Sequence, residues 1–122
     1  MKIIITDDSA IMRKIISRCL TDMGYDIIEA ENGQEALNAI DSNKGNITLV
    51  FLDWNMPIMS GFEALRAIKS NPETKGIPVI MATTESSKSD ILKAIQTVAS
   101  GYIVKPFQKE TIIAKVKSVL KL

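Results

Sequence analysis

The chain contains no histidine and only one cysteine, Cys19, among its 122 residues. The absence of histidine excludes histidine triads, imidazole metal ligands and a role as a phosphohistidine donor. A single cysteine cannot form an internal disulfide, and a lone thiol among apolar neighbours suits a reducing compartment, so we expect a cytoplasmic protein. Any chemistry must therefore depend on carboxylates, hydroxyls and lysine.

The chain also lacks a strong net charge and a long apolar run. Its 15 basic and 14 acidic side chains leave a net charge of +1, which favours neither nucleic acid nor an anionic membrane as a partner. The opening sequence MKIIITDDS is far less apolar than the core of a signal peptide or a membrane span. These absences leave other proteins as the expected partners.

A length of 122 residues suits one compact core, so we expect a single domain over residues 1–122. Short apolar runs rich in β-branched residues alternate with stretches of helical period, which is typical of a parallel sheet covered by helices. The predicted strands are Lys2 to Thr6, Asp26 to Ala30, Ile47 to Asp53, Pro78 to Thr83 and Gly101 to Val104. The sequence thus predicts an α/β fold.

Apolar residues at helical spacing lie between or after these strands, and each set predicts a helix face that packs on the sheet. The sets are Ile11, Ile15, Cys19 and Met23; Phe62, Leu65 and Ile68; Ile91, Leu92 and Ile95; and Ile112, Val116 and Val119.

Polar side chains lie at the carboxyl ends of the predicted strands, where ligands gather in an open parallel sheet. They are Asp7 and Asp8 after the first strand, Asp53 at the end of the third, Thr83 and Thr84 at the end of the fourth, and Lys105 after the fifth. Converging carboxylates repel one another unless a cation lies among them, and oxygen ligands favour magnesium. Lysine and a threonine hydroxyl can bind phosphoryl oxygens. The set predicts a phosphoryl-transfer site with a carboxylate nucleophile.

Each of these residues also has an ordinary structural explanation when it is taken alone. Asp8 or Ser9 can cap the following helix, and Asp53 or Lys105 can be a common loop residue. The functional interpretation rests on position, because these residues close different strands at one edge of the sheet.

The motifs around these residues resemble the response-regulator receiver family, and most closely its stand-alone chemotaxis members. The resemblance covers the whole chain through IIITDDSAIMRK, LVFLDWNMPIMSG, PVIMATTES and SGYIVKPF. It implies a flavodoxin-like, doubly wound five-stranded parallel sheet in the order 2-1-3-4-5 with five helices. It also implies a monomer that is not an enzyme, because a receiver catalyses only its own phosphorylation and dephosphorylation.

The resemblance assigns roles to the site residues. By this resemblance Asp53 is the phospho-acceptor, and Asp7, Asp8 and Asp53 hold one Mg²⁺ ion. The main-chain carbonyl of Asn55 completes the protein ligands, and Lys105 pairs with the phosphoryl group.

The resemblance also identifies residues for switching and output. Thr83 corresponds to the switch hydroxyl, and Tyr102 to the aromatic side chain that turns inward when this hydroxyl moves. Lys88, Tyr102 and Lys115 belong to the output face, which is built from the fourth helix, the fifth strand and the fifth helix. The implied partners are a CheA-like histidine kinase and a FliM-like flagellar switch protein or another protein target.

Three features are typical of the chemotaxis type. They are Trp54 after the acceptor, Asn55 and Glu85, which flank the phosphoryl site and tune dephosphorylation, and the run Ser100-Gly101-Tyr102. Trp54 is equally compatible with a half-buried loop aromatic that has no functional role.

Two positions depart from the family pattern. Ser60 replaces the usual Asp or Asn, but serine is an equally good helix N-cap. Val98 replaces a glycine near the end of the fourth helix, and a β-branched residue rarely adopts the left-handed conformation. We therefore expect Val98 to keep a negative φ. The resemblance also implies a cis Lys105-Pro106 peptide bond, an isomer that proline allows at low cost.

Alternatives remain both inside and outside the family. A phosphorelay shuttle would pass its phosphoryl group to another protein's histidine. A phosphohydrolase of the haloacid-dehalogenase type needs a second acid two residues after the nucleophile, where this chain has Asn55. A flavodoxin-like electron carrier would bind a flavin phosphate, which Asp7 and Asp8 would repel.

Overall fold

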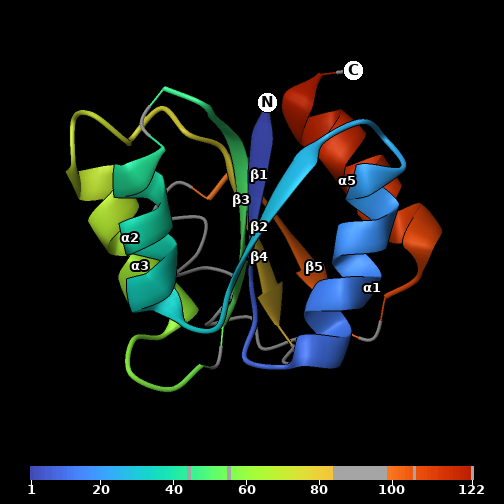
Figure 1. Cartoon of the computed structure of the whole chain (residues 1–122), viewed down its shortest axis with the longest axis horizontal. Helices are drawn as coiled ribbons and strands as arrows, with labels where there is room; N and C mark the ends of the chain where they lie inside the picture. Colours follow the sequence, from blue (N-terminus) through green and yellow to red (C-terminus); the bar gives the residue numbers. More distant parts are fainter. Residues whose placement is uncertain (44, 55, 84–98, 106, 122) are drawn as a thin grey trace.

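A five-stranded parallel sheet forms the centre of the computed structural model, which describes residues 1–43, 45–54, 56–83, 99–105 and 107–121 (Figure 1). The strands are β1 (Lys2–Thr6), β2 (Asp26–Ala30), β3 (Ile47–Asp53), β4 (Val79–Thr83) and β5 (Gly101–Val104). They pair in the order β2-β1-β3-β4-β5, and every pairing is parallel. The predicted sheet order is confirmed. β4 begins one residue later than predicted, because Pro78 has no N–H to offer the ladder.

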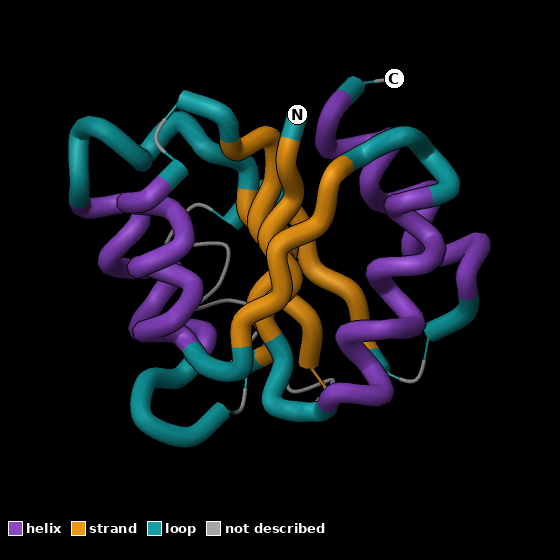
Figure 2. Tube along the Cα trace, in the orientation of Figure 1, coloured by secondary structure: helices purple, strands orange, loops and turns teal. Residues whose placement is uncertain are grey.

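Helices cover both faces of this sheet. α1 (Ala10–Thr21) and α5 (Lys109–Leu120) lie together on one face, and α2 (Gly33–Ser42) and α3 (Gly61–Ser70) lie on the other (Figures 1 and 2). The prediction of a further helix with Ile91, Leu92 and Ile95 falls on residues 84–98, which lie outside the described residues, and so does the prediction for Val98.

The sheet separates two apolar cores, and the alternation of side chains along each strand decides which core a residue joins. In β1, Ile3 and Ile5 pack with α1 and α5, whereas Ile4 packs with α2 and α3. All three isoleucines are fully buried. A strand that is buried on both faces positions the residues at its carboxyl end firmly, and Asp7 follows β1 directly.

The predicted face of α1 is partly wrong. Ile11 and Ile15 are 75% and 47% exposed, and the helix instead buries Ile16, Cys19 and Leu20. The reason is geometric, because residues spaced by four advance around a helix of 3.6 residues per turn by roughly 40° at each step. A stripe of this spacing that reaches the core at Cys19 has therefore turned away from the core at Ile11.

The other described helix faces follow the prediction more closely. Leu65 and Ile68 of α3 are buried, as are Ile112 and Val116 of α5. Within the described ranges, none of the helices has both the length and the apolarity that a membrane crossing requires.

Candidate phosphoryl-acceptor site

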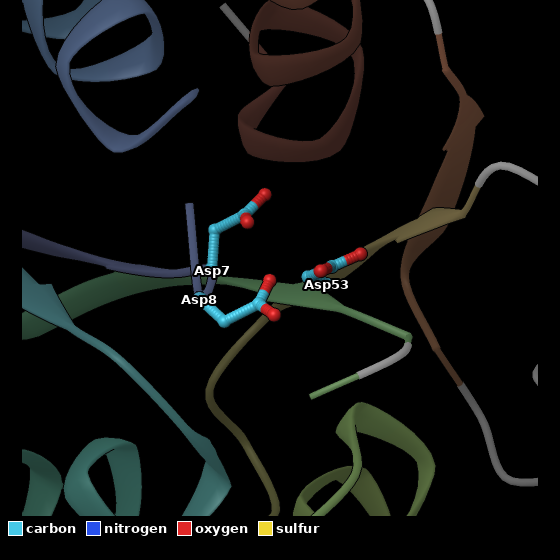
Figure 3. Close-up of side chains that lie close together, drawn as sticks. All are labelled: Asp7, Asp8 and Asp53. Atoms are coloured by element: carbon cyan, nitrogen blue, oxygen red, sulfur yellow. The ribbon is translucent and has the colours of Figure 1, made fainter. Parts of the chain in front are cut away.

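Three carboxylates meet at the edge of the sheet where the parallel strands end. Asp7 and Asp8 follow β1, and Asp53 is the last residue of β3. Each offers an oxygen atom, and these atoms all lie within 4.8 Å of one another (Figure 3). The sequence predicted this convergence from the strand ends alone.

Lys105 links the two buried members of this cluster. Its Nζ donates hydrogen bonds to Asp7 Oδ2 at 2.9 Å and to Asp53 Oδ1 at 3.1 Å. The main-chain N–H of Lys105 donates to the carbonyl of Thr83 at 2.7 Å, which fixes the chain beyond β5 against the end of β4. The lysine side chain is 13% exposed, so its charge acts where water screens it only weakly.

Every polar group of Asp7 has a hydrogen-bond partner. Its main-chain N–H donates to the carbonyl of Ala30 in β2 at 3.1 Å, and its Oδ1 accepts from the N–H of Ser9 at 2.9 Å. Only 2% of the residue is exposed. Because Asp7 is buried and hydrogen-bonded on both carboxylate oxygens, its position is determined by the fold.

Asp8 differs from its neighbour because it is exposed. Ser9 is the N-cap of α1, and its side chain accepts a hydrogen bond from the N–H of Met12 at 3.2 Å. The capping role that the sequence left open between Asp8 and Ser9 therefore belongs to Ser9. The Asp8 carboxylate does not cap the helix and can therefore face an ion at the edge of the site.

The electrostatics of the site penalise the charge on Asp53. Burial raises the pKa of the Asp53 carboxyl from its ordinary value of 3.8 to about 6, and Asp7 adds to the rise while Lys105 opposes it. Although burial disfavours the charged ammonium, the hydrogen bonds to Asp7 and Asp53 raise the pKa of Lys105, which stays protonated. One lysine does not offset the carboxylates completely. The all-oxygen set therefore fits a divalent cation such as Mg²⁺.

Gly61 shapes the segment that follows Asp53, and its role was not predicted from the sequence. A Cβ at Gly61 would overlap the carbonyl oxygen of Asp53, so the first turn of α3 lies directly against the end of β3. The Gly61 N–H donates to the carbonyl of Trp54 at 3.0 Å. Ser60 caps α3 in a capping box with Glu63, so the predicted N-cap is confirmed.

Trp54 lies in this segment and is half-buried. Its N–H donates to the carbonyl of Ala82 in β4 at 2.7 Å. Its ring stacks on Phe62 with centroids 5.3 Å apart and an interplanar angle of 6°. Trp54 is therefore anchored next to Asp53 by both its main chain and its side chain.

The remaining predicted residues divide into two groups. Thr83 is buried at the end of β4, whereas Tyr102 on β5 is 37% exposed and lies 5.9 Å from the Nζ of Lys115 on α5, measured to the ring centroid. The residues Asn55, Glu85, Lys88 and Pro106 lie outside the described residues, so their predicted roles stay predictions.

This fold and site define a class of protein. The family description for the response regulator receiver domain matches residues 3–117, and the chain belongs to this family. Asp7, Asp53 and Lys105 lie in the matched range, as do all the strand residues except Lys2 at the start of β1.

Similar curated proteins narrow the class to the chemotaxis type. The chain is 40% identical to the chemotaxis protein CheY1 of Helicobacter pylori over 98% of this chain and 97% of the relative. It is 38% identical to the chemotaxis protein CheY of Pseudomonas aeruginosa over 99% of this chain and 97% of the relative. The solved structure of chemotaxis protein CheY4 of Vibrio cholerae superposes with a TM-score of 0.90 at 34% identity and covers 98% of each chain. The chain is thus a receiver of the CheY type.

Proposed function

We propose that the chain is a response regulator that accepts a phosphoryl group on Asp53 from the phosphohistidine of a sensor kinase, with Mg²⁺ bound. Its proposed output is control of the flagellar motor. The names of its relatives, which are chemotaxis proteins, support a role in chemotaxis. The observation that carries the proposal is the Lys105 ammonium, which lies within hydrogen-bond distance of both Asp7 and Asp53.

The transfer step follows from the chemistry of these groups. A carboxylate oxygen of Asp53 attacks the phosphorus atom, and the O–P bond forms as the N–P bond of the phosphohistidine breaks. The electron pair of the broken bond stays on the imidazole nitrogen of the donor, which takes up a proton from water. The acyl phosphate that results carries its charge on the phosphoryl oxygens.

Lys105 and Asp7 have separate tasks in this step. The ammonium of Lys105 moves from the carboxylates to the incoming phosphoryl oxygens, which are stronger acceptors. Asp7, Asp8 and Asp53 would hold magnesium. When bound, the metal offsets the negative charge of the carboxylates and of the phosphoryl group.

The protein acts on itself and is not an enzyme for external substrates, because Asp53 is consumed in each transfer and regenerated only by hydrolysis. We place it in the cytoplasm as a monomer, in agreement with its lone buried thiol, Cys19. Tyr102 and Lys115 contribute to the output face, where the described structure brings them into contact.

Beryllofluoride, a phosphoryl mimic, tests the acceptor site. We expect binding only in the presence of magnesium, because the acidic cluster repels another anion until a cation offsets it. Asp53→Asn should abolish binding, whereas Asp26→Asn, which removes an exposed acid on β2, should leave it unchanged. Tight binding of the mimic to wild-type protein without any metal would contradict the proposed site.

A binding assay with flagellar switch components tests the output. The beryllofluoride form should bind them and the free form should not. Transfer of phosphate to a histidine of another protein, with no binding to the switch, would identify a phosphorelay shuttle instead.

A further inference from the structure

Arg13, on the second turn of α1, makes contacts that the mechanism above does not use. Its Nη1 donates to the main-chain carbonyl of Asp7 at 2.7 Å, and its Nε donates to Glu29 Oε1 on β2 at 3.0 Å. Its Nη2 lies 3.9 Å from Glu31 Oε1. Only 11% of the side chain is exposed, although α1 places most of its charged residues in water.

The acceptor of the first contact is the carbonyl of the peptide that joins Asp7 to Asp8. Because a peptide unit is planar, the direction of this carbonyl sets the direction of the bond to the Cα of Asp8. Asp7 is already fixed through Ala30, Ser9 and its carboxylate. Asp8 is exposed, and in the described part of the structure a charged side chain holds this peptide at the Asp7 carbonyl.

The guanidinium is itself held in place from β2. A planar guanidinium can donate in two directions at once, and here one direction meets the Asp7 carbonyl while the other meets Glu29. Glu29 and Glu31 also offset the positive charge, so Arg13 adds little net repulsion toward a cation.

We infer that Arg13 is a positioning residue for the divalent-metal site, because it orients the peptide between Asp7 and Asp8 so that both carboxylates face the same ion. The inference rests on the proposed magnesium-dependent function. Residues that hold metal ligands from outside the coordination sphere typically contribute 10- to 100-fold to metal affinity.

Titration calorimetry with Mg²⁺ tests this role through the sign of the effect. Arg13→Met should weaken magnesium binding roughly 10- to 100-fold, in line with other residues that hold metal ligands. If Arg13 acted only through its charge, its removal near a cation site would strengthen binding instead. Lys14→Met is the matched control, because it removes the same charge from the adjacent, exposed position and should leave affinity unchanged or slightly stronger.

The free energy of unfolding distinguishes the positioning role of Arg13 from a purely structural role. A structural role alone would lower the stability in chelator and leave the affinity for magnesium unchanged. Arg13→Lys keeps the charge and the apolar stem, but its single ammonium cannot occupy both donor positions, so we expect a severalfold loss of affinity. If Arg13→Met does not fold, this variant decides the question.

Different experimental results would contradict this inference and the proposed function. A wild-type protein that binds no magnesium would contradict the proposed function itself. A wild-type protein that binds magnesium, with a folded Arg13→Met or Arg13→Lys variant of equal or higher affinity, would overturn only the role of Arg13.

Discussion

Asp53 illustrates at the scale of one residue how a position that suits the proposed function can oppose stability. Its carboxylate is buried beside Asp7, and the folded state therefore binds a proton there more tightly than the unfolded chain does, with a pKa of about 6 against 3.8. In the absence of metal, the free energy of unfolding should fall as the pH rises from about 4 to about 6. Above that range the ionised Asp53 lowers the free energy of unfolding by a constant amount.

Asp53→Asn should remove this cost. We expect the variant to be more stable than the wild type at pH 8 in chelator by roughly 1–2 kcal/mol, which allows for screening by solvent and by Lys105. Below pH 4 both proteins carry a neutral side chain at this position, and the difference should vanish. Urea denaturation across this pH range measures it. A difference that is the same at pH 4 and pH 8 would show that charge is not the cause.

Lys105 has the opposite effect on stability, because its ammonium stabilises the folded state. Lys105→Met should leave two buried carboxylates without their cation, and the loss of one partner of a buried pair costs about 3 kcal/mol. Magnesium should restore much of this stability, so the variant should depend on magnesium more strongly than the wild type does. Beryllofluoride affinity should fall at least about tenfold, because a hydrogen bond to a charged group is lost.

Lys115→Met is the control for this prediction, since Lys115 contacts Tyr102 and not the acidic cluster. Denaturation with and without magnesium measures the first effect. Equal magnesium dependence in Lys105→Met and in wild-type protein would contradict the role assigned to the ammonium.

At the scale of the elements, the close approach of α3 to the end of β3 depends on the absence of one side chain. Gly61→Ala would place a Cβ on the carbonyl oxygen of Asp53, where main-chain atoms cannot yield as a flexible side chain can. We expect a loss of about 3 kcal/mol in the free energy of unfolding, at the upper end of the cost of overpacking. Magnesium affinity should fall as well, because the end of β3, which carries Asp53, must shift.

Gly76→Ala provides the matched control, because a Cβ at this position meets nothing within 4 Å. Thermal denaturation and titration calorimetry of both variants test the prediction. A Gly61→Ala protein with wild-type stability would mean that α3 can move away from β3 without cost.

The elements also show which parts of the fold can be predicted from sequence. The bounds of β1, β2, β3 and β5 follow from apolar, β-branched runs, and the position of the acids follows from the rule that parallel strands end at one edge. These signals are local or depend on topology alone.

The contacts of Arg13 and Gly61 could not be predicted in the same way. Each depends on a distance between two elements that the chain order does not set. The exposure of Ile11 shows the same limit, because helical spacing defines a stripe but not which end of the stripe meets the sheet. Where packing decides the outcome, a pattern of residue types leaves several arrangements open.

At the scale of the whole molecule, magnesium should act as a stabilising ligand. A ligand that binds only the folded state raises the free energy of unfolding by about 2.7 kcal/mol at a concentration of 100 times its Kd. Trp54 is the only tryptophan, and it is adjacent to Asp53, so its emission should change over the same titration. Fluorescence and calorimetry should give the same Kd. Flat emission during calorimetrically observed binding would exclude Trp54 as a reporter.

The position of β2 at one margin of the sheet has a consequence for crowded solutions. An edge strand presents unpaired main-chain groups that can template a strand from another molecule. β2 carries two exposed acids, Asp26 and Glu29. Because Arg13 pairs with Glu29, the repulsion between two aligned β2 strands would come mainly from Asp26 of each chain. This repulsion guards against sheet-to-sheet aggregation. It favours the monomer proposed above, which would diffuse singly between the kinase that phosphorylates it and its target.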